Sequence, residues 1–220
     1  MATRGFADGR DHLKWGVFAL VAACALAVAY VDERFLIRAS DPHWRHIEPV
    51  KWLLLPHGLF GLTALVAGAV QFSDRIRRAY LPVHRWVGRL YLLSVSIAAP
   101  LAFYIGTGPI EPASIRVEQA FQSGLWWLSA AIGFACIRNR QIAAHKAWMM
   151  RSYAFTLIFV VSRVPDLVFA SYSDQMLSDL LWGLVVLALF VPELGITMRE
   201  LARLRGRRRP AALGSSTPSQ

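Results

Sequence analysis

Charged residues are scarce in this chain, and acidic residues are the scarcest of them. Only 17% of the 220 residues are charged, and 14 Asp and Glu stand against 24 Lys and Arg, which gives a net charge of +10. The hydrophobic residues make up 55% of the chain and fall into six long apolar runs. Each run is near the ~20 residues needed to cross the hydrocarbon layer of a bilayer. This combination excludes an ordinary soluble domain.

Other chemical signatures are also missing. The chain holds two cysteines, Cys24 in the middle of the first apolar run and Cys136 near the inner end of the fourth. We expect no disulfide between them, so cysteine usage says nothing about the redox compartment. The sequence also lacks a nucleotide-binding fingerprint, a nucleophile motif and the spacing of a zinc site. These absences argue against an ordinary enzyme, and they leave open whether the protein has an enzymatic activity at all.

The apolar runs predict an all-α, polytopic membrane protein with six transmembrane helices. The runs cover residues 13–31, 50–72, 86–106, 117–137, 147–171 and 176–198. We expect one domain over residues 1–200 whose four-helix core is a duplicated helical hairpin, with repeats at 50–110 and 114–171. Residues 201–220 read as a basic, disordered tail. The stretch V21-A-A-C24 resembles a cleavage signal, but the apolar run continues through Val31, which favours an uncleaved first helix.

The basic residues gather on one side of this predicted topology. With the N-terminus inside, the inside segments hold 16 of the 24 Lys and Arg, and the outside loops hold five. This bias predicts that both termini lie in the cytoplasm. The Arg-rich stretch 199–209 is then expected to bind anionic lipid. We expect no binding to nucleic acid, because no soluble nucleic-acid module accompanies the charge. The oligomeric state stays open.

Two stretches at the predicted inner helix ends resemble each other. They read R77-R-A-Y-L-P-V-H84-R-W-V-G-R89-L-Y91 and R138-N-R-Q-I-A-A-H145-K-A-W-M-M-R151-S-Y153. If a pseudo-two-fold axis relates the two hairpins, His84 and His145 lie at the same depth. Two such imidazoles can be the axial ligands of haem b, with Arg85, Arg89 and Arg151 pairing the propionates. Two alternatives stay open, which are a structural or proton-handling role and plain anchoring at the membrane interface.

A second polar cluster is predicted at the outer helix ends. His57 begins a helix face of small and polar residues, and the fourth apolar run repeats the same spacing from Gln122. Arg163 and Asp166 form an i, i+3 pair of opposite charge at a similar depth. Polar groups in hydrocarbon need partners. We therefore expect an outer site of these four residues, with Glu118 as a further candidate, that takes a quinone, another small molecule or a proton.

Several of these motifs resemble a family of bacterial predicted membrane proteins, domain of unknown function 2306. The similar pieces span roughly residues 50–170 and are H57-G-L-F-G, G68-A-V-Q71-F, the R78 to Y91 stretch, H145-K-A-W-M-M-R-S-Y-A and Arg163 beyond them. The resemblance implies an integral protein of the bacterial inner membrane and no assigned reaction.

The architecture also looks like the six-helix transmembrane b-type cytochromes that pass electrons from ascorbate. That resemblance implies a four-helix core with two bis-histidine haems, one near each membrane face. His84 and His145 match the pair on the third and fifth helices, and His57 matches a ligand on the second. Gln122 stands where the fourth-helix ligand belongs, so the resemblance implies one haem at most.

The leading hypothesis is a b-haem electron carrier or a quinone-linked redox protein. One rival is a small transporter or proton-relaying permease, which the Arg163 and Asp166 pair favours. Another is a non-catalytic assembly protein whose polar residues only specify helix pairing.

Overall fold

The computed structural model describes residues 48–109, 111–163 and 173–208, together with five helical positions of the first apolar run. The helices in these ranges are α3 (Lys51–Gln71), α4 (Asp74–Ala79), α5 (Leu81–Gly106), α6 (Ala113–Arg138), α7 (Ile142–Val161) and α9 (Asp174–Arg208). No strand occurs in this described part of the chain. The predicted all-α class is therefore confirmed there.

Four helices, α3, α5, α6 and α9, are long and apolar enough to cross a membrane. They correspond to the second, third, fourth and sixth predicted spans. The predicted fifth span begins as α7, whose first half carries His145, Lys146 and Arg151 and so shortens its apolar part. Residues 164–171 of that span, and most of the first span, lie outside the described residues. The chain is a multi-pass helical membrane protein, and the count of six spans stays a prediction.

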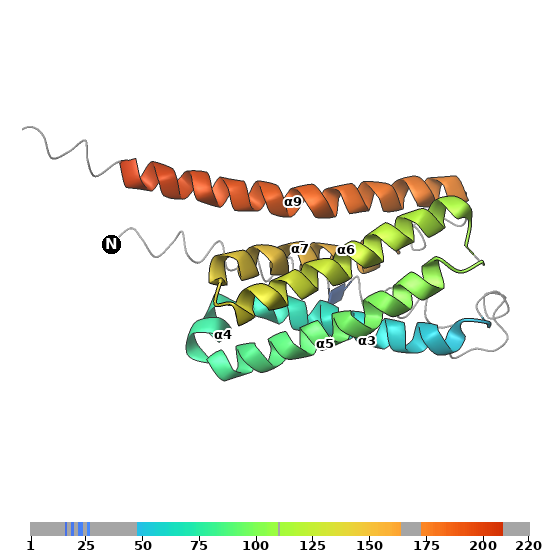
Figure 1. Ribbon diagram of the computed structural model, residues 1–220, viewed down its shortest axis with the longest axis horizontal. Helices are drawn as coiled ribbons and strands as arrows, with labels where there is room; N and C mark the ends of the chain where they lie inside the picture. The colour runs from blue at the N-terminus through green and yellow to red at the C-terminus, as the bar shows by residue number, and fades with distance from the viewer. Residues whose placement is uncertain are drawn as a thin grey trace, which may run out of the picture.

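Two pairs of helices form the core. Helices α3 and α5 pack side by side, as do α6 and α7, and α5 against α6 joins the two pairs (Figure 1). A smaller contact between α3 and α7 closes the four-helix arrangement. The long α9 lies along α7 and α6 on one side of this core (Figure 1).

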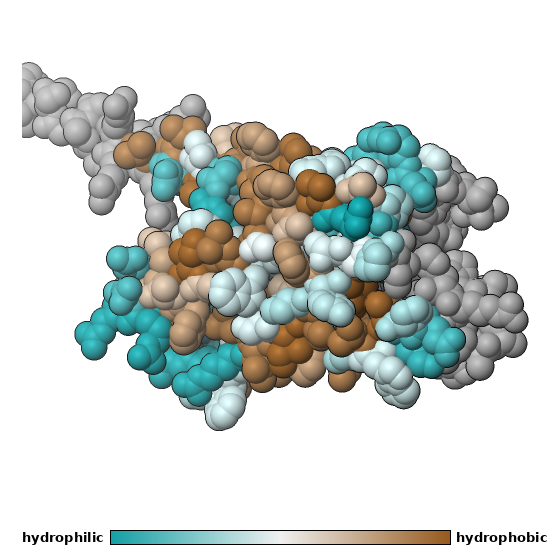
Figure 2. Space-filling view, turned by 45° about the vertical axis from the view of Figure 1, so that its right-hand side comes forward, coloured by the Kyte–Doolittle hydropathy of each residue, from teal (hydrophilic) through white to brown (hydrophobic). Residues whose placement is uncertain are grey.

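Small side chains let the core helices approach closely. Ala64 and Ala67 of α3 and Ala98 and Ala99 of α5 are all buried in one cluster. Without a hydrophobic driving force between helices in lipid, such small residues are what allows tight van der Waals packing. Large apolar side chains point outward instead, and Figure 2 shows them as a band between more hydrophilic ends. This is the surface expected of helices that face lipid.

The two hairpins are closed by different turns. In the first, the short helix α4 lies between α3 and α5, and it begins where Ser73 Oγ accepts a hydrogen bond from the Ile76 N–H at 3.4 Å. Pro82 then lies in the first turn of α5, where its missing N–H has no helical partner to lose.

The second hairpin is closed by residues 139–141 alone. Arg140 has a positive φ of 61°. The Gln141 N–H donates to the Cys136 carbonyl at 2.9 Å, and the Arg140 N–H donates to the Ile137 carbonyl at 3.1 Å. This pair of bonds is the Schellman pattern that ends many helices, and it turns the chain directly into α7.

The last helix ends later than the predicted domain boundary. Helix α9 continues to Arg208, through residues that the sequence suggested as part of a disordered tail from 201. Residues 201–208 are mostly Leu, Ala and Arg, which are good helix formers, so the helix extends beyond the apolar span. Residues 209–220 lie outside the described part of the chain.

Candidate functional site

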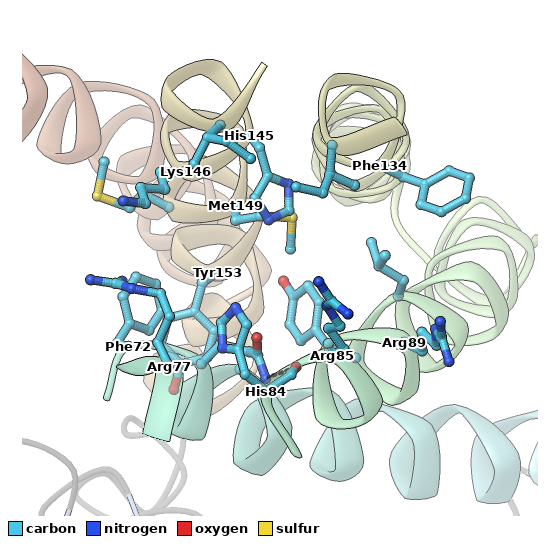
Figure 3. A pocket seen from close by; sticks show the side chains of 18 of the residues that line it. Phe72, Arg77, His84, Arg85, Arg89, Phe134, His145, Lys146, Met149 and Tyr153 are labelled. Carbon is cyan, nitrogen blue, oxygen red and sulfur yellow. Dashed lines mark hydrogen bonds between the residues drawn. The ribbon is translucent and has the colours of Figure 1, made fainter. Parts of the chain in front are cut away.

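A cavity of about 700 Å³ lies between the helices at the end of the bundle where α4 joins α3 to α5 (Figure 3). The four core helices supply most of its walls, with Arg77 from α4 and Arg199 from α9. Its volume falls in the range of roughly 300–1,000 Å³ that small-molecule and cofactor sites occupy. The cavity is therefore large enough for a ligand the size of a cofactor.

His84 and His145 face each other across this cavity (Figure 3). Each is the fourth residue of its helix, His84 in α5 and His145 in α7. Their backbone N–H groups make equivalent bonds to the residue before each helix, at 3.0 Å to the Tyr80 carbonyl and 2.9 Å to the Gln141 carbonyl. These matching positions bring the two rings to one site, as the repeated motif predicts. Their role as haem ligands stays a prediction.

The His145 ring is held by a backbone carbonyl. Its Nδ1 lies 2.8 Å from the Gly133 carbonyl oxygen of α6. Because a carbonyl oxygen only accepts, Nδ1 carries the hydrogen and Nε2 of the neutral ring keeps its lone pair. Histidines that bind metals are commonly oriented by such a bond.

The His84 ring is held less firmly. Its Nδ1 is buried and has no hydrogen-bond partner among the described residues. Gln71 Nε2 instead donates to the backbone carbonyl of His84 at 3.0 Å. A buried ring nitrogen without a partner is a group that a ligand could satisfy. Arg77, His145 and Lys146 all lie within electrostatic range of this ring.

The cavity walls carry many positive charges and, within the described part of the chain, no Asp or Glu. The basic side chains that line it are Arg77, Arg85, Arg89, Arg138, Lys146 and Arg199. Apolar residues such as Phe72, Leu92 and Phe134 complete the lining. Such a site favours a ligand that is apolar in its body and anionic at its edge.

Arg151, predicted to pair a propionate, is not among the residues that line the cavity. Its Nε donates to Glu193 Oε1 of α9 at 2.5 Å, and its guanidinium lies 4.6 Å from the centre of the Trp148 ring. The physical reason is helical phase. Arg89 follows its histidine by five residues and Arg151 by six, and one residue turns a side chain by about 100° around the helix.

A family model described as "Predicted membrane protein (DUF2306)" matches residues 54–196. The chain belongs to this family. The match covers most of both hairpins, all cavity-lining residues except Arg199, and much of α9. Comparison with curated proteins and with solved structures gives no match. The predicted resemblance is confirmed, and it brings no reaction or ligand with it.

The wall of this DUF2306 cavity leads into a buried hydroxyl cluster that the sequence did not single out as a site. Tyr91 lines the cavity, and its hydroxyl lies 2.7 Å from Ser152 Oγ and 3.1 Å from Thr156 Oγ1. The Trp126 Nε1–H donates to Thr156 Oγ1 at 3.0 Å. The available signal was the i, i+4 spacing of Ser152 and Thr156 on one face of α7. That signal could not identify Tyr91 as their partner.

The predicted outer cluster is brought together in part. His57 Nδ1 lies 3.0 Å from the Ala98 carbonyl oxygen of α5, and its ring meets the Phe159 ring edge-on at 6.0 Å. Arg163, just after α7, lies within electrostatic range of the His57 ring. Asp166 lies outside the described residues.

Gln122 and Glu118 lie one turn apart on α6, at the end opposite to the cavity. Glu118 is 0% exposed. Both its carboxyl oxygens and Gln122 Oε1 are buried without a hydrogen-bond partner among the described residues. In the same part of the chain, no group of three or more His, Cys, Asp or Glu could hold a metal ion. The unpartnered carboxyl is the clearest feature of this end.

Proposed function

We propose that this protein is a membrane-embedded b-type haem protein in which His84 and His145 would bind the haem iron. The observation that carries the proposal is that two histidines at equivalent positions of α5 and α7 face each other across one cation-lined cavity. When bound there, haem would supply one-electron transfer.

The ring environments support axial ligation. The bond from His145 Nδ1 to the Gly133 carbonyl fixes the ring and directs the lone pair to Nε2. The Nδ1 of His84 is buried and has no hydrogen-bond partner among the described residues, so a ligand could supply a partner to this ring. Gly88, one turn after His84, also lines the cavity, and its missing side chain lets the Gln71 amide approach α5.

The basic side chains support an anionic edge on the ligand. Arg85 and Arg89 lie one turn apart on α5, and a guanidinium can pair a carboxylate through two parallel hydrogen bonds. Arg77 and Arg199 extend the positive lining toward α4 and α9. In this proposal these basic side chains would pair with the propionates.

A groove of about 350 Å³ between α5 and α6 gives a lipid-soluble electron partner a path to this site. It shares Arg89, Leu92 and Phe134 with the cavity. Leu93 and Trp127 also line it, and both are about half exposed, so the groove faces the lipid. A quinone fits this chemistry, because its ring oxygens accept hydrogen bonds and its tail is apolar.

We also propose that the cavity end faces the cytoplasm of the inner membrane. Most of the basic residues lie at the same ends of the helices as the cavity, and the positive-inside bias puts such ends in the cytoplasm. The Arg-rich end of α9 then lies at an anionic lipid surface.

Visible spectroscopy of the protein purified from haem-replete cells tests the proposal. We expect a Soret band, with α and β bands that sharpen on reduction by dithionite. His84→Ala and His145→Ala should each lose this spectrum, because a single axial histidine no longer holds the iron from both sides. Both variants should still elute from size-exclusion chromatography as the wild type does.

Two arginine variants test whether haem retention depends on an arginine in the cavity wall or only on the total positive charge. Arg85→Gln should weaken haem retention several-fold, because it removes a charge-assisted partner from the cavity wall. Arg151→Gln should retain haem as the wild type does, because Arg151 pairs with Glu193 instead. A colourless wild-type protein with an intact elution profile would contradict the haem proposal.

A further inference from the structure

Glu118 is the least expected side chain in the bundle. It is 0% exposed, and neither of its carboxyl oxygens has a hydrogen-bond partner among the described residues. Burying an ionised carboxylate without a counter-charge costs several kcal/mol in an apolar environment. A membrane helix that places a carboxyl there needs a means of neutralising it.

The surroundings of Glu118 are tightly packed. On the neighbouring residue, Gln119 Cβ lies so close to α5 that a Cβ added at Gly106 would meet it at 2.7 Å. On the other side of α6, the Phe121 ring contacts the Trp182 ring of α9 in a tilted arrangement, with the ring centres 5.8 Å apart. Such packing leaves little room for a ligand beside this turn of α6, whereas a proton needs no cavity.

Gln122 gives the second, independent observation. It lies four residues after Glu118, so the two side chains are neighbours on one face of α6. Its Oε1 is also buried without a partner in the described part of the chain. Two carboxyl oxygens and one amide oxygen are therefore buried on this face, and none of them receives a hydrogen bond from the described residues. A proton on Glu118 would turn one acceptor into a donor, and Gln122 Oε1 lies on the same face to accept it.

We propose that Glu118 is a proton-binding site at the end of the bundle opposite to the histidine cavity, with Gln122 as the acceptor for the bound proton. The site lies about 22 Å along α6 from Gly133, at a rise of 1.5 Å per residue. It goes beyond the haem proposal and does not depend on it.

The other titratable and charged groups near this end have partners of their own or make no hydrogen bond to Glu118. His57 of α3 bonds to the Ala98 carbonyl, and Arg163 after α7 interacts with the His57 ring. Asp179 of α9 accepts a bond from Gln175 at 2.7 Å. Lys51 of α3 pairs with Glu48 at 3.3 Å. Within the described residues, none of the groups at this end is bonded to Glu118, and the remaining ones are Tyr104, Glu111, Arg116 and Asp174.

Infrared spectroscopy of the full-length protein in H₂O and D₂O tests the site. We expect the carbonyl stretch of a protonated carboxyl at neutral pH, with a shift in D₂O. The band should be lost in Glu118→Gln and kept in Glu200→Gln, which makes the same change at an exposed position of α9. Gln122→Leu should keep the band and move it to higher wavenumber, because the carboxyl loses its acceptor.

Two results would overturn the proposal. In the first, the difference between the wild-type and Glu118→Gln spectra contains no band of a protonated carboxyl. In the second, that difference contains carboxylate bands that shift on addition of Na⁺, which would indicate a bound metal cation. If Glu118→Gln does not fold, Gln122→Leu provides the test. A carboxyl band that moves to higher wavenumber in this variant supports the proton site, and an unchanged band contradicts it. The visible spectrum is recorded on the same samples. A colourless protein that keeps the band would contradict the haem proposal and leave the proton site standing.

Discussion

The two hairpins carry the same motif, yet they hold their histidines in different ways. In α6 and α7, the Gly133 carbonyl binds the His145 ring at 2.8 Å, and a tight turn connects the helices. In α3 and α5, the His84 ring nitrogen Nδ1 has no partner among the described residues, and the helix α4 lies between the two helices. A repeated sequence therefore fixes where the two rings lie, whereas the partner helix fixes how each ring is oriented.

Gly68 of α3 and Gly133 of α6 occupy matching positions, and replacing each with alanine should give the largest difference in stability between the two hairpins. A Cβ at Gly68 would lie 2.4 Å from Tyr153 Cδ2 and 3.0 Å from Tyr91 Cε2, whereas a Cβ at Gly133 would meet the flexible Met149 Sδ at 2.8 Å. Gly68→Ala should destabilise the protein by about 1–3 kcal/mol, because the rigid rings must shift. Gly133→Ala should stay within about 0.5 kcal/mol of the wild type, because methionine adapts. Thermal unfolding in detergent measures both, and equal effects would contradict the difference.

Removing the hydroxyl groups of Tyr91 and Tyr153 should give the next largest difference in stability. Tyr91→Phe should cost about 1–2 kcal/mol, because its hydroxyl binds both Ser152 and Thr156 in a buried site. Tyr153→Phe should cost about 0.5 kcal/mol, because it loses one bond of 3.2 Å to the Leu65 carbonyl, which lies within α3. The same unfolding measurement compares the pair. A loss for Tyr91→Phe that is no larger than the loss for Tyr153→Phe would contradict this contrast.

The smallest predicted change in stability comes from a substitution in the tight turn between α6 and α7. Arg140 has a φ of 61°, a conformation that is unfavourable for residues other than glycine. Arg140→Gly should therefore stabilise the second hairpin by about 0.5–1 kcal/mol. Arg140→Ala is the matched control, and it should give no gain because alanine keeps the unfavourable conformation. A gain in both variants would assign the effect to the lost charge instead of the backbone.

Much of the fold follows from sequence patterns that are local. The apolar runs predicted the spans that α3, α5, α6 and α9 now occupy, because length and hydropathy decide which segments can cross a bilayer. The end of α9 was harder to predict, since helix-forming residues continue past the apolar span to Arg208. The repeated motif also predicted that His84 and His145 share a site, because equal distances from the helix starts give equal depth.

The parts of the site that sequence missed depend on helix rotation and on neighbours. Arg151 differs from Arg89 by one residue of spacing, and that rotation places it against Glu193 instead of the cavity. The partners of Tyr91 come from α7, 61 and 65 residues away along the chain. No local pattern identifies contacts of that kind.

By itself, the sequence determined that this chain is a helical membrane protein and that the two histidines occupy matching positions near the starts of two helices. Those properties depend on hydropathy, charge and residue spacing along single helices. Only the tertiary structure decided that the basic residues surround one cavity, that a carbonyl of α6 orients His145, and that Glu118 is buried without a partner among the described residues. Those properties depend on how the helices are rotated against one another, and packing between helices sets that rotation.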